Sequence, residues 1–261
     1  MTREINRLPT NWSSIQNVWL RNFRHFRKAW MANVFWIILE PLFFLLAIGY
    51  GIGSFIPDIS GDSYVEFFFP ALLCISSMMI SFFEGTYGNF SKLTYQKTYS
   101  TMLLTPLETK HIVIGEILWG ASKGTFSALG VSLVASIFGH LNGWMIIPAL
   151  MVIFISSFLF AGLGMLVTSF VKNYDGIIYP TSGLMVPMSL FSGTYFPLEQ
   201  IAVGLKYASY VLPLTHSVVV VRGLFLEQFQ WTWLINIAVL LILCYLITRS
   251  AITRIDQKLI K

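Results

Sequence analysis

The chain has 261 residues, of which 56% are hydrophobic and 11% charged, and its formal net charge is +5. A soluble globular domain carries roughly 25% charged residues, and one soluble core could not bury this much apolar surface. The composition therefore excludes an ordinary soluble protein. Because the basic residues are sparse and lie at the ends of apolar runs, it also argues against a nucleic-acid-binding patch. We expect the chain to lie in a lipid bilayer.

Residues 11–31 are predicted to form an amphipathic helix at the membrane surface. Aromatic and apolar side chains recur at intervals of three and four residues, and cations lie on the opposite face, which is typical of an interfacial helix near anionic head groups. Ser13 with Gln16 fits a capping box at its start. A helix docked on a partner protein is the alternative, and the two can coexist. The apolar face comprises Ile15, Trp19, Phe23, Phe26 and Trp30, and the cations are Arg21, Arg24 and Lys28.

Six apolar runs are predicted to cross the bilayer as helices, so the fold class is an all-α polytopic membrane protein. A span needs roughly 20 apolar residues. The sixth run is short and contains Pro180 and Pro187, but neighbouring helices can satisfy the backbone groups that proline frees. In chain order the predicted spans are about Asn33–Phe55, Tyr64–Gly85, Ile112–Phe138, Trp144–Val171, Gly176–Ser192 and Trp231–Ser250.

The positions of the basic residues predict that both termini are cytoplasmic. The loops Ile56–Ser63 and Gly139–Gly143 contain no Lys or Arg. The termini and the alternate loops hold most of the 17 basic residues, which the positive-inside rule places in the cytoplasm. These residues are Arg3, Arg7, Arg21, Arg24, Arg27, Lys28, Lys92, Lys97, Lys110, Lys172, Arg249, Arg254, Lys258 and Lys261.

Residues 193–229 are predicted to form a re-entrant helical hairpin on the outer side, before the last span. The stretch is apolar in patches but is interrupted by prolines and charged residues. A further crossing here would place the basic tail outside, against the charge rule. We therefore expect two short helices, near Leu198–Tyr210 and Leu214–Phe225, that dip into the outer leaflet and return to the same side. Such a segment is tolerated where protein or a water-lined cavity covers its backbone. The whole chain, residues 1–261, is thus one membrane domain.

The sequence carries no recognisable catalytic, nucleotide-binding or metal site. The segment Gly115-Glu-Ile-Leu-Trp-Gly120 begins like a phosphate-binding loop, but Ala121 and Ser122 follow where Lys and Ser or Thr are required. No pair among the four histidines has the spacing of metal ligands. We therefore expect a protein that is not an enzyme and that binds no cofactor itself.

Ionisable residues inside predicted spans are few, and each is a candidate for function because burying a charge in hydrocarbon costs several kcal/mol. Glu66, Glu84 and Glu116 are expected to snorkel or to form structural pairs. Glu116 and Lys123 lie two turns apart on one face and could contact the surface helix, a neighbouring span or water. Glu40 lies deeper in the first span and is the strongest functional candidate of this kind.

Aromatic residues make up 16% of the chain. Most are expected to form interfacial belts or lipid-facing surfaces. A minority could line a path for an amphiphilic cargo, because sugar rings and acyl chains both pack on aromatic faces. With Glu40, the candidates for such a path are Trp36, Phe43, Tyr50 and Tyr179.

The arrangement resembles the membrane permeases of type-2 ABC exporters, particularly the branch that includes the nodulation-factor export permease. The resemblance covers nearly the whole chain. The segments that carry it are Ile38-Leu-Glu-Pro-Leu-Phe43, Gly49-Tyr-Gly-Ile-Gly53, Lys97-Thr-Tyr-Ser-Thr-Met-Leu-Leu-Thr-Pro-Leu107, Gly115-Glu-Ile-Leu-Trp-Gly120, Phe191-Ser-Gly-Thr-Tyr-Phe-Pro-Leu198 and Leu212-Pro-Leu-Thr-His216.

The resemblance implies a permease in the bacterial cytoplasmic membrane that exports an amphiphile such as a lipid-linked glycan, a lipo-oligosaccharide or a drug. It implies two cytoplasmic ATPase subunits, which bind ATP and Mg²⁺, and a second permease, with a homodimer as our expectation. The cytoplasmic loop 92–110 would hold a coupling helix that docks in the ATPase. The residues expected to make this contact are Lys97, Thr98, Tyr99, Thr101, Met102 and Leu103.

Two other classes of protein remain open from the residues alone. An ion-coupled secondary transporter usually shows more acidic groups near the midplane and often an internal repeat, neither of which is evident here. An intramembrane enzyme could bring Ser192 and His216 together on one side of the membrane, but no nucleophile-elbow pattern surrounds Ser192. Both fit the sequence less well than an exporter subunit.

Overall fold

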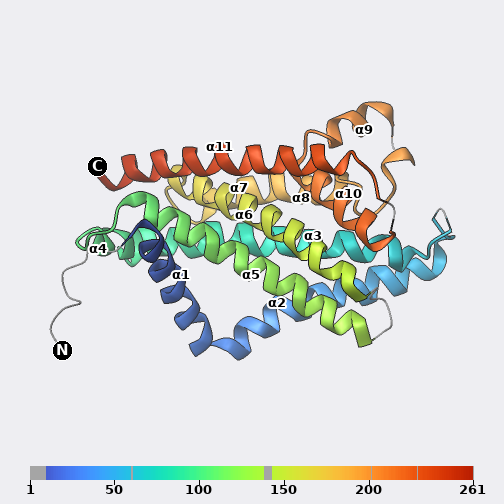
Figure 1. The fold of residues 1–261 in the computed structure, drawn as a ribbon, viewed down its shortest axis with the longest axis horizontal. Helices are drawn as coiled ribbons and strands as arrows, with labels where there is room; N and C mark the ends of the chain where they lie inside the picture. Colours follow the sequence, from blue (N-terminus) through green and yellow to red (C-terminus); the bar gives the residue numbers. More distant parts are fainter. Residues whose placement is uncertain (1–9, 60, 138–142, 201, 228, 261) are drawn as a thin grey trace.

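The computed structural model describes residues 10–59, 61–137, 143–200, 202–227 and 229–260. It is 85% helical, and no strand occurs among the described residues. Arg3, Arg7, Lys261 and most of the Gly139–Gly143 loop lie outside them. The long helices run side by side along one axis (Figure 1), which confirms an all-α polytopic membrane protein.

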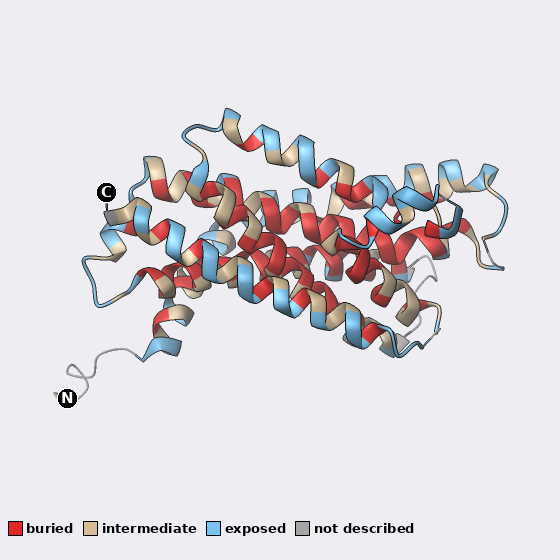
Figure 2. Cartoon of the chain, turned by 90° about the horizontal axis from the view of Figure 1, so that it is seen from above, coloured by how far each residue is buried: buried red, intermediate tan, exposed pale blue. Residues whose placement is uncertain are grey.

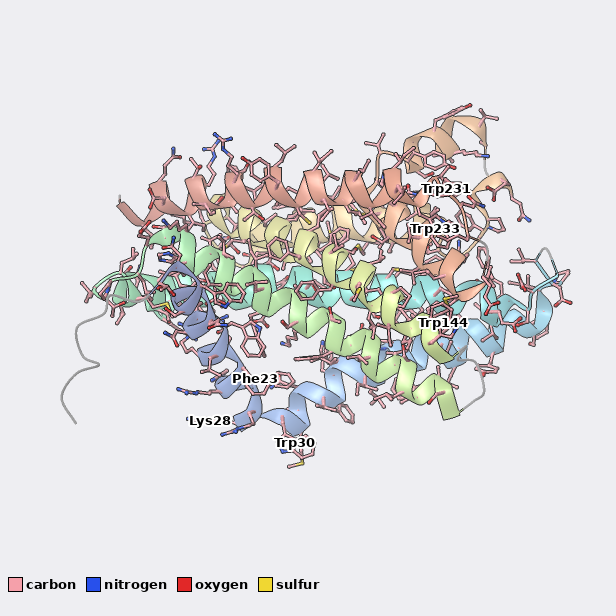
Figure 3. The ribbon with its side chains drawn as sticks, in the orientation of Figure 1. Phe23, Lys28, Trp30, Trp144, Trp231 and Trp233 are labelled. Atoms are coloured by element: carbon pink, nitrogen blue, oxygen red, sulfur yellow. The ribbon has the colours of Figure 1, made fainter. Side chains whose placement is uncertain are left out.

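Helix α1, Asn11–Lys28, crosses the direction of the long helices near one end of the bundle (Figure 1). The predicted cap at Ser13 is wrong, because the helix begins one turn earlier. The Thr10 side chain caps it by accepting a hydrogen bond from the Ser13 backbone N–H at 3.3 Å. At Ala29 the backbone leaves the helical region, so Trp30 starts the next helix and does not belong to the surface helix. Lys28 and Trp30 point away from the bundle at this corner (Figure 3).

Five long helical segments are apolar enough to cross a membrane. The second is longer than predicted, since it continues in π-helical turns to Tyr95, where the sequence suggested an end near Gly85. The segments are Trp30–Phe55 (α2 Trp30–Phe44, η1 Leu45–Gly51, η2 Ile52–Phe55), Tyr64–Tyr95 (α3 Tyr64–Phe83, η3 Glu84–Gly88, η4 Ser91–Tyr95), α5 Thr109–Ile137, α6 Ile146–Phe170, which follows η5 Gly143–Met145, and α11 Trp233–Ile260.

The sixth predicted span is an unbroken run of helical turns, from Asp175 to Phe191. It consists of α7 Asp175–Pro180, η6 Thr181–Met185 and α8 Val186–Phe191. Because Pro180 and Pro187 lack an N–H, the π-helical turn between them absorbs the break in the hydrogen-bond ladder. At 1.5 Å per residue, the run is about 25 Å long, slightly shorter than the hydrocarbon core of a bilayer.

The predicted hairpin is present as two short helices that meet at 90°. It comprises η7 Leu198–Gln200, α9 Val203–Ser209 and α10 Pro213–Phe225. These helices lie at the end of the bundle opposite α4 (Thr98–Met102) and the C-terminus (Figure 1). We call the two ends the hairpin end and the α4 end. Since the chain reaches and leaves the hairpin at the same end, the segment does not add a crossing.

Helix α6 is the centre of the fold and packs against α3, α5, α10 and α11. Buried residues concentrate in this central layer, whereas the peripheral helices are largely exposed (Figure 2). Small residues allow the close approach, as is common in membrane bundles. A Cβ atom added to Gly85 would lie 2.5 Å from the Ala161 carbonyl oxygen and 3.0 Å from the Gly164 Cα. The contact between η3 and α6 therefore requires glycine at this position.

Replacing Gly85 with alanine is expected to lower the free energy of unfolding by about 1–3 kcal/mol, the usual effect of overpacking a close contact. Gly183→Ala is the matched control. Outside the adjacent residues and the local helical backbone, no atom of the described residues lies within 4 Å of the Cβ position at Gly183, so a change that leaves stability equal or slightly higher is expected there. Thermal unfolding of the two purified variants measures the difference, and equal melting temperatures would contradict the packing described here.

Candidate functional site

The short helix α4 is held against the bundle by one buried side chain, Tyr99. Its backbone starts at Lys97, whose φ of 53° lies in the left-handed region and reverses the chain after η4. Tyr99 is fully buried in an apolar cluster with Leu93, Ile112 and Ile255. Burial raises the pKa of the Tyr99 hydroxyl well above its ordinary value, so the group stays neutral. Tyr99 therefore anchors α4 to the ends of η4, α5 and α11.

This burial corrects the sequence-based assignment of Tyr99 as a direct ATPase contact, because a side chain without exposed surface cannot touch a docked protein. Among the other predicted contacts, Lys97 and Thr101 are exposed, and Thr98, Met102 and Leu103 are half-buried. Sequence reasoning missed the most prominent side chain of this loop, Leu104, which is 87% exposed. Leu104 is an apolar residue in a polar loop and lies shortly before Pro106. This pattern could have identified Leu104 as a candidate contact.

A buried ion network lies directly behind α4. The Glu116 side chain has no exposed surface and accepts hydrogen bonds from Arg21 at 2.7 Å, from Asn22 at 2.8 Å and from Lys92 at 2.8 Å. These three partners come from α1 and η4, whereas Glu116 is on α5. Arg21 also places Nη1 3.5 Å from the Met102 sulfur of α4. One carboxylate thus connects the surface helix, two bundle helices and the start of the α4 loop.

A second carboxylate, Glu84, extends the network. It accepts hydrogen bonds from Lys123 at 2.9 Å, from Lys92 at 3.3 Å and from the Trp119 indole N–H at 3.2 Å. Two carboxylates therefore compensate three cations within the bundle. Sequence analysis expected structural pairs for Glu84 and Glu116, and the structure contains them. The third acid of that group, Glu66, closes a capping box with Ser63 at the start of α3.

Helix α1 docks on α5 through a stripe of small and apolar contacts. Val18 is buried against Gly115, where an added Cβ would lie 2.6 Å from the Val18 Cβ. Trp19, Phe23 and Phe26 surround the Trp119 ring, with their ring centroids 5.6–6.4 Å from that of Trp119. The Trp19 indole donates a hydrogen bond to Ser122 at 3.0 Å. Much of the apolar face that predicted membrane binding thus covers α5 of the same chain.

Between α1, the end of the second span and α5 lies a polar cavity of about 590 Å³. Arg21, Lys92 and Lys123 line it together with Trp119 and Asn33. The cavity lies beside α1, and cations of the ion network line it. A change in the tilt of α1 would therefore alter both the cavity and the ion network.

The outer face of α2 combines aromatic side chains with one acid. Trp36 and Phe43 are 61% and 58% exposed, and Glu40 lies between them on the same face. These residues line a shallow cavity of about 450 Å³ on the helix surface. A second cavity of about 330 Å³, between α2, α3 and α8, shares Trp36 and Glu40. Three of the five predicted cargo-path residues therefore lie together.

The other two predicted path residues lie elsewhere. Tyr50 is half-buried and packs against the main apolar core. Tyr179 is 79% exposed on α7 and lines neither of the cavities beside Glu40. The structure thus limits the candidate path to one face of α2 and its groove with α3 and α8.

The geometry gives no support to the alternative of an intramembrane enzyme. His216 lies within hydrogen-bond distance of the Asn236 side chain (2.7 Å) and the Tyr210 carbonyl oxygen (3.0 Å). The Ser192 hydroxyl is buried and has no hydrogen-bond partner among the described residues. Ser192 and His216 therefore form no nucleophile–base pair in this structure.

Comparison with known proteins places the chain in a family. Residues 13–226 match the model of the ABC-2 type transporter family. The chain belongs to this family. It is 33% identical to Nodulation protein J of Rhizobium leguminosarum bv. viciae over 218 residues, which cover 84% of this chain and 83% of that protein. It is 32% identical to Nodulation protein J of Rhizobium meliloti (84% of each) and 22% identical to the inner membrane transport permease YadH of Escherichia coli (79% and 80%).

Proposed function

We propose that this ABC-2 type transporter subunit exports an amphiphilic cargo, such as a lipid-linked glycan, a lipo-oligosaccharide or a drug, from the cytoplasm or the inner leaflet. Two copies of a separate ATPase subunit bind ATP and Mg²⁺ and supply the energy. The chain lies in a bacterial inner membrane with the α4 end and both termini in the cytoplasm. The observation that carries this proposal is the arrangement of the α4 end, where the buried Tyr99 holds the helix and neighbouring side chains are exposed.

The α4 end suits a docking surface for the ATPase. The helix is fixed from inside by Tyr99 and presents Lys97, Thr101 and Leu104 outward. A rigidly held helix can transmit a displacement to the bundle, whereas a flexible loop would move without transmitting it. The Glu116 network behind α4 would pass such a displacement to α1 and α5, which border the polar cavity.

Replacing Leu104 with glutamate is expected to abolish co-purification of the ATPase subunit, because a charge would replace the most exposed apolar side chain of the docking surface. A loss of at least about tenfold in affinity is expected, which corresponds to about 1.4 kcal/mol. Val211→Glu is the matched control, since Val211 is 79% exposed at the hairpin end. Affinity purification in mild detergent followed by mass spectrometry measures both. Equal recovery of the ATPase with the two variants would refute docking at α4.

The outer face of α2 suits contact with a second copy of this chain. An exposed carboxylate facing lipid costs several kcal/mol, and a partner or a lined cavity removes this cost. In a pair of permeases with apposed α2 helices, Trp36, Glu40 and Phe43 of both copies would line a shared path for the cargo. The aromatic faces suit acyl chains or sugar rings, and Glu40 suits a polar head group.

A cysteine at Phe43 is expected to cross-link two copies of the chain in native membranes. A cysteine at Tyr245, which is 63% exposed on α11, is expected to give only monomer. Both variants carry Cys74→Ala and Cys244→Ala, so that the introduced cysteine is the only one among the 261 residues. Electrophoresis after oxidation measures the dimer band. Cross-linking at position 245 and not at 43 would place the interface on the other side of the bundle.

A further inference from the structure

A second polar cavity lies at the hairpin end, far from α4. It has a volume of about 290 Å³ and is bounded by the start of α3, η7, α10 and the start of α11. This volume is at the lower limit of small-molecule pockets, roughly 300 Å³. The residues that matter for its chemistry are Asp62, Phe67, Glu199, Tyr210, Arg222 and Trp233.

Arg222 lines this cavity, and hydrogen bonds hold its side chain in place. Its Nε donates to the Phe67 carbonyl at 3.0 Å, and its Nη2 donates to the carbonyls of Gly193 at 2.8 Å and Thr194 at 3.4 Å. The guanidinium also lies over the Phe67 ring, 3.8 Å from the centroid. No described carboxylate is within salt-bridge distance of Arg222, and Nη1 has no hydrogen-bond partner among the described residues. The side chain is thus locked in place with one donor group available.

Acceptors line the same cavity. Asp62 and Glu199 contribute carboxylates that form no side-chain hydrogen bond or ion pair with another described residue. An anionic ligand would be repelled by these two groups, and a cationic ligand would be repelled by Arg222. A neutral molecule with many hydroxyl groups can accept from the guanidinium and donate to the carboxylates at once.

Aromatic side chains complete the cavity. Trp233 is buried and held by Gly223, whose added Cβ would lie 2.4 Å from the Trp233 ring. Tyr210 is 43% exposed at the cavity. Figure 3 places Trp233 at the hairpin end, beside the exposed Trp231. Aromatic rings next to hydroxyl-binding groups provide the apolar surface on which the C–H face of a sugar ring packs.

We propose that this cavity is a saccharide-binding site, which takes the sugar portion of an exported amphiphile at the hairpin end. The site itself rests on the contacts of Arg222 and on the position of Asp62 and Glu199 at the cavity, whereas its role in export rests on the proposed function. Nothing in the α4 end is required for the sugar to bind.

The test uses the purified full-length protein with its associated ATPase, in nanodiscs. Binding of maltotriose, cellotriose and chitotriose is measured by saturation-transfer NMR and calorimetry, and inorganic phosphate and Ca²⁺ are tested in parallel. At least one trisaccharide is expected to bind at millimolar concentration. Asp62→Asn and Glu199→Gln are each expected to weaken that binding about tenfold, the effect of losing one charge-assisted hydrogen bond. Glu227→Gln, an exposed acid of the hairpin outside the cavity, is expected to leave it unchanged.

Three results would overturn the site: no trisaccharide binds, the Asp62 and Glu199 variants bind as well as the parent, or phosphate or Ca²⁺ binds there in place of sugar. The proposed function is judged separately by recovery of the ATPase. A complex that assembles through α4 but binds no sugar refutes only the saccharide site. A chain that binds sugar through Asp62 and Glu199 but recovers no ATPase refutes the exporter assignment and leaves the site intact.

Discussion

Replacing Glu116 with leucine is expected to lower the free energy of unfolding by about 3–5 kcal/mol, the usual effect of removing one partner from a buried ion pair. The Glu116 side chain is fully buried, and the change would leave Glu84 as the only network carboxylate for Arg21, Lys92 and Lys123. For a chain of this size, a fall of about 10 °C in melting temperature is expected. Thermal unfolding in mild detergent measures it.

Two comparisons separate the network from a general effect of losing an acid. Glu108→Gln removes an exposed carboxylate whose partner is the half-buried Lys110, at 2.8 Å, so little change in stability is expected. The double variant Arg21→Met with Glu116→Leu is expected to be less destabilised than the sum of the single variants, since neither charge is then left alone. Strict additivity of the two changes would show that Arg21 and Glu116 do not interact energetically.

The same network explains why sequence reasoning ended the second span too early. Glu84, Asn89 and Lys92 read as the start of a polar loop. In the structure Lys92 pairs with both Glu84 and Glu116, and Phe90 and Leu93 are buried between these polar positions. A helix can continue through polar residues when other elements supply their partners. Lys123, which pairs with Glu84, lies 39 positions away in the chain, and Glu116, which pairs with Lys92, lies 24 away, so no local pattern could reveal these partners.

Features set by local chemistry were predictable, and features set by tertiary contacts were not. Long apolar runs identified five spans because bilayer thickness fixes their length, and paired prolines marked the interrupted sixth run. The structure places three of the candidate path residues, Trp36, Glu40 and Phe43, on one face of α2. All four aromatic candidates were chosen by residue type, and the positions of Tyr50 and Tyr179 depend on how η1 and α7 pack.

The inward orientation of Tyr99 leads to the second large expected effect. Replacing Tyr99 with alanine is expected to lower the free energy of unfolding by about 3–5 kcal/mol, as for other large buried aromatic residues, and to release α4 from the bundle. ATP hydrolysis by a bound ATPase is then expected to lose its dependence on cargo, because a detached α4 cannot transmit displacement. Melting temperature and ATPase activity of the reconstituted complex measure the two effects.

Tyr99→Phe distinguishes an internal anchor from a surface contact. The Tyr99 hydroxyl is buried and has no hydrogen-bond partner among the described residues, so removing it leaves no group unsatisfied. Phenylalanine is therefore expected to preserve stability, or to raise it slightly, and to keep the ATPase coupled. If the hydroxyl instead bonded to the ATPase, Tyr99→Phe would impair docking while leaving the melting temperature of the isolated permease unchanged. An anchor thus requires the aromatic ring alone, whereas a docking contact would require the oxygen.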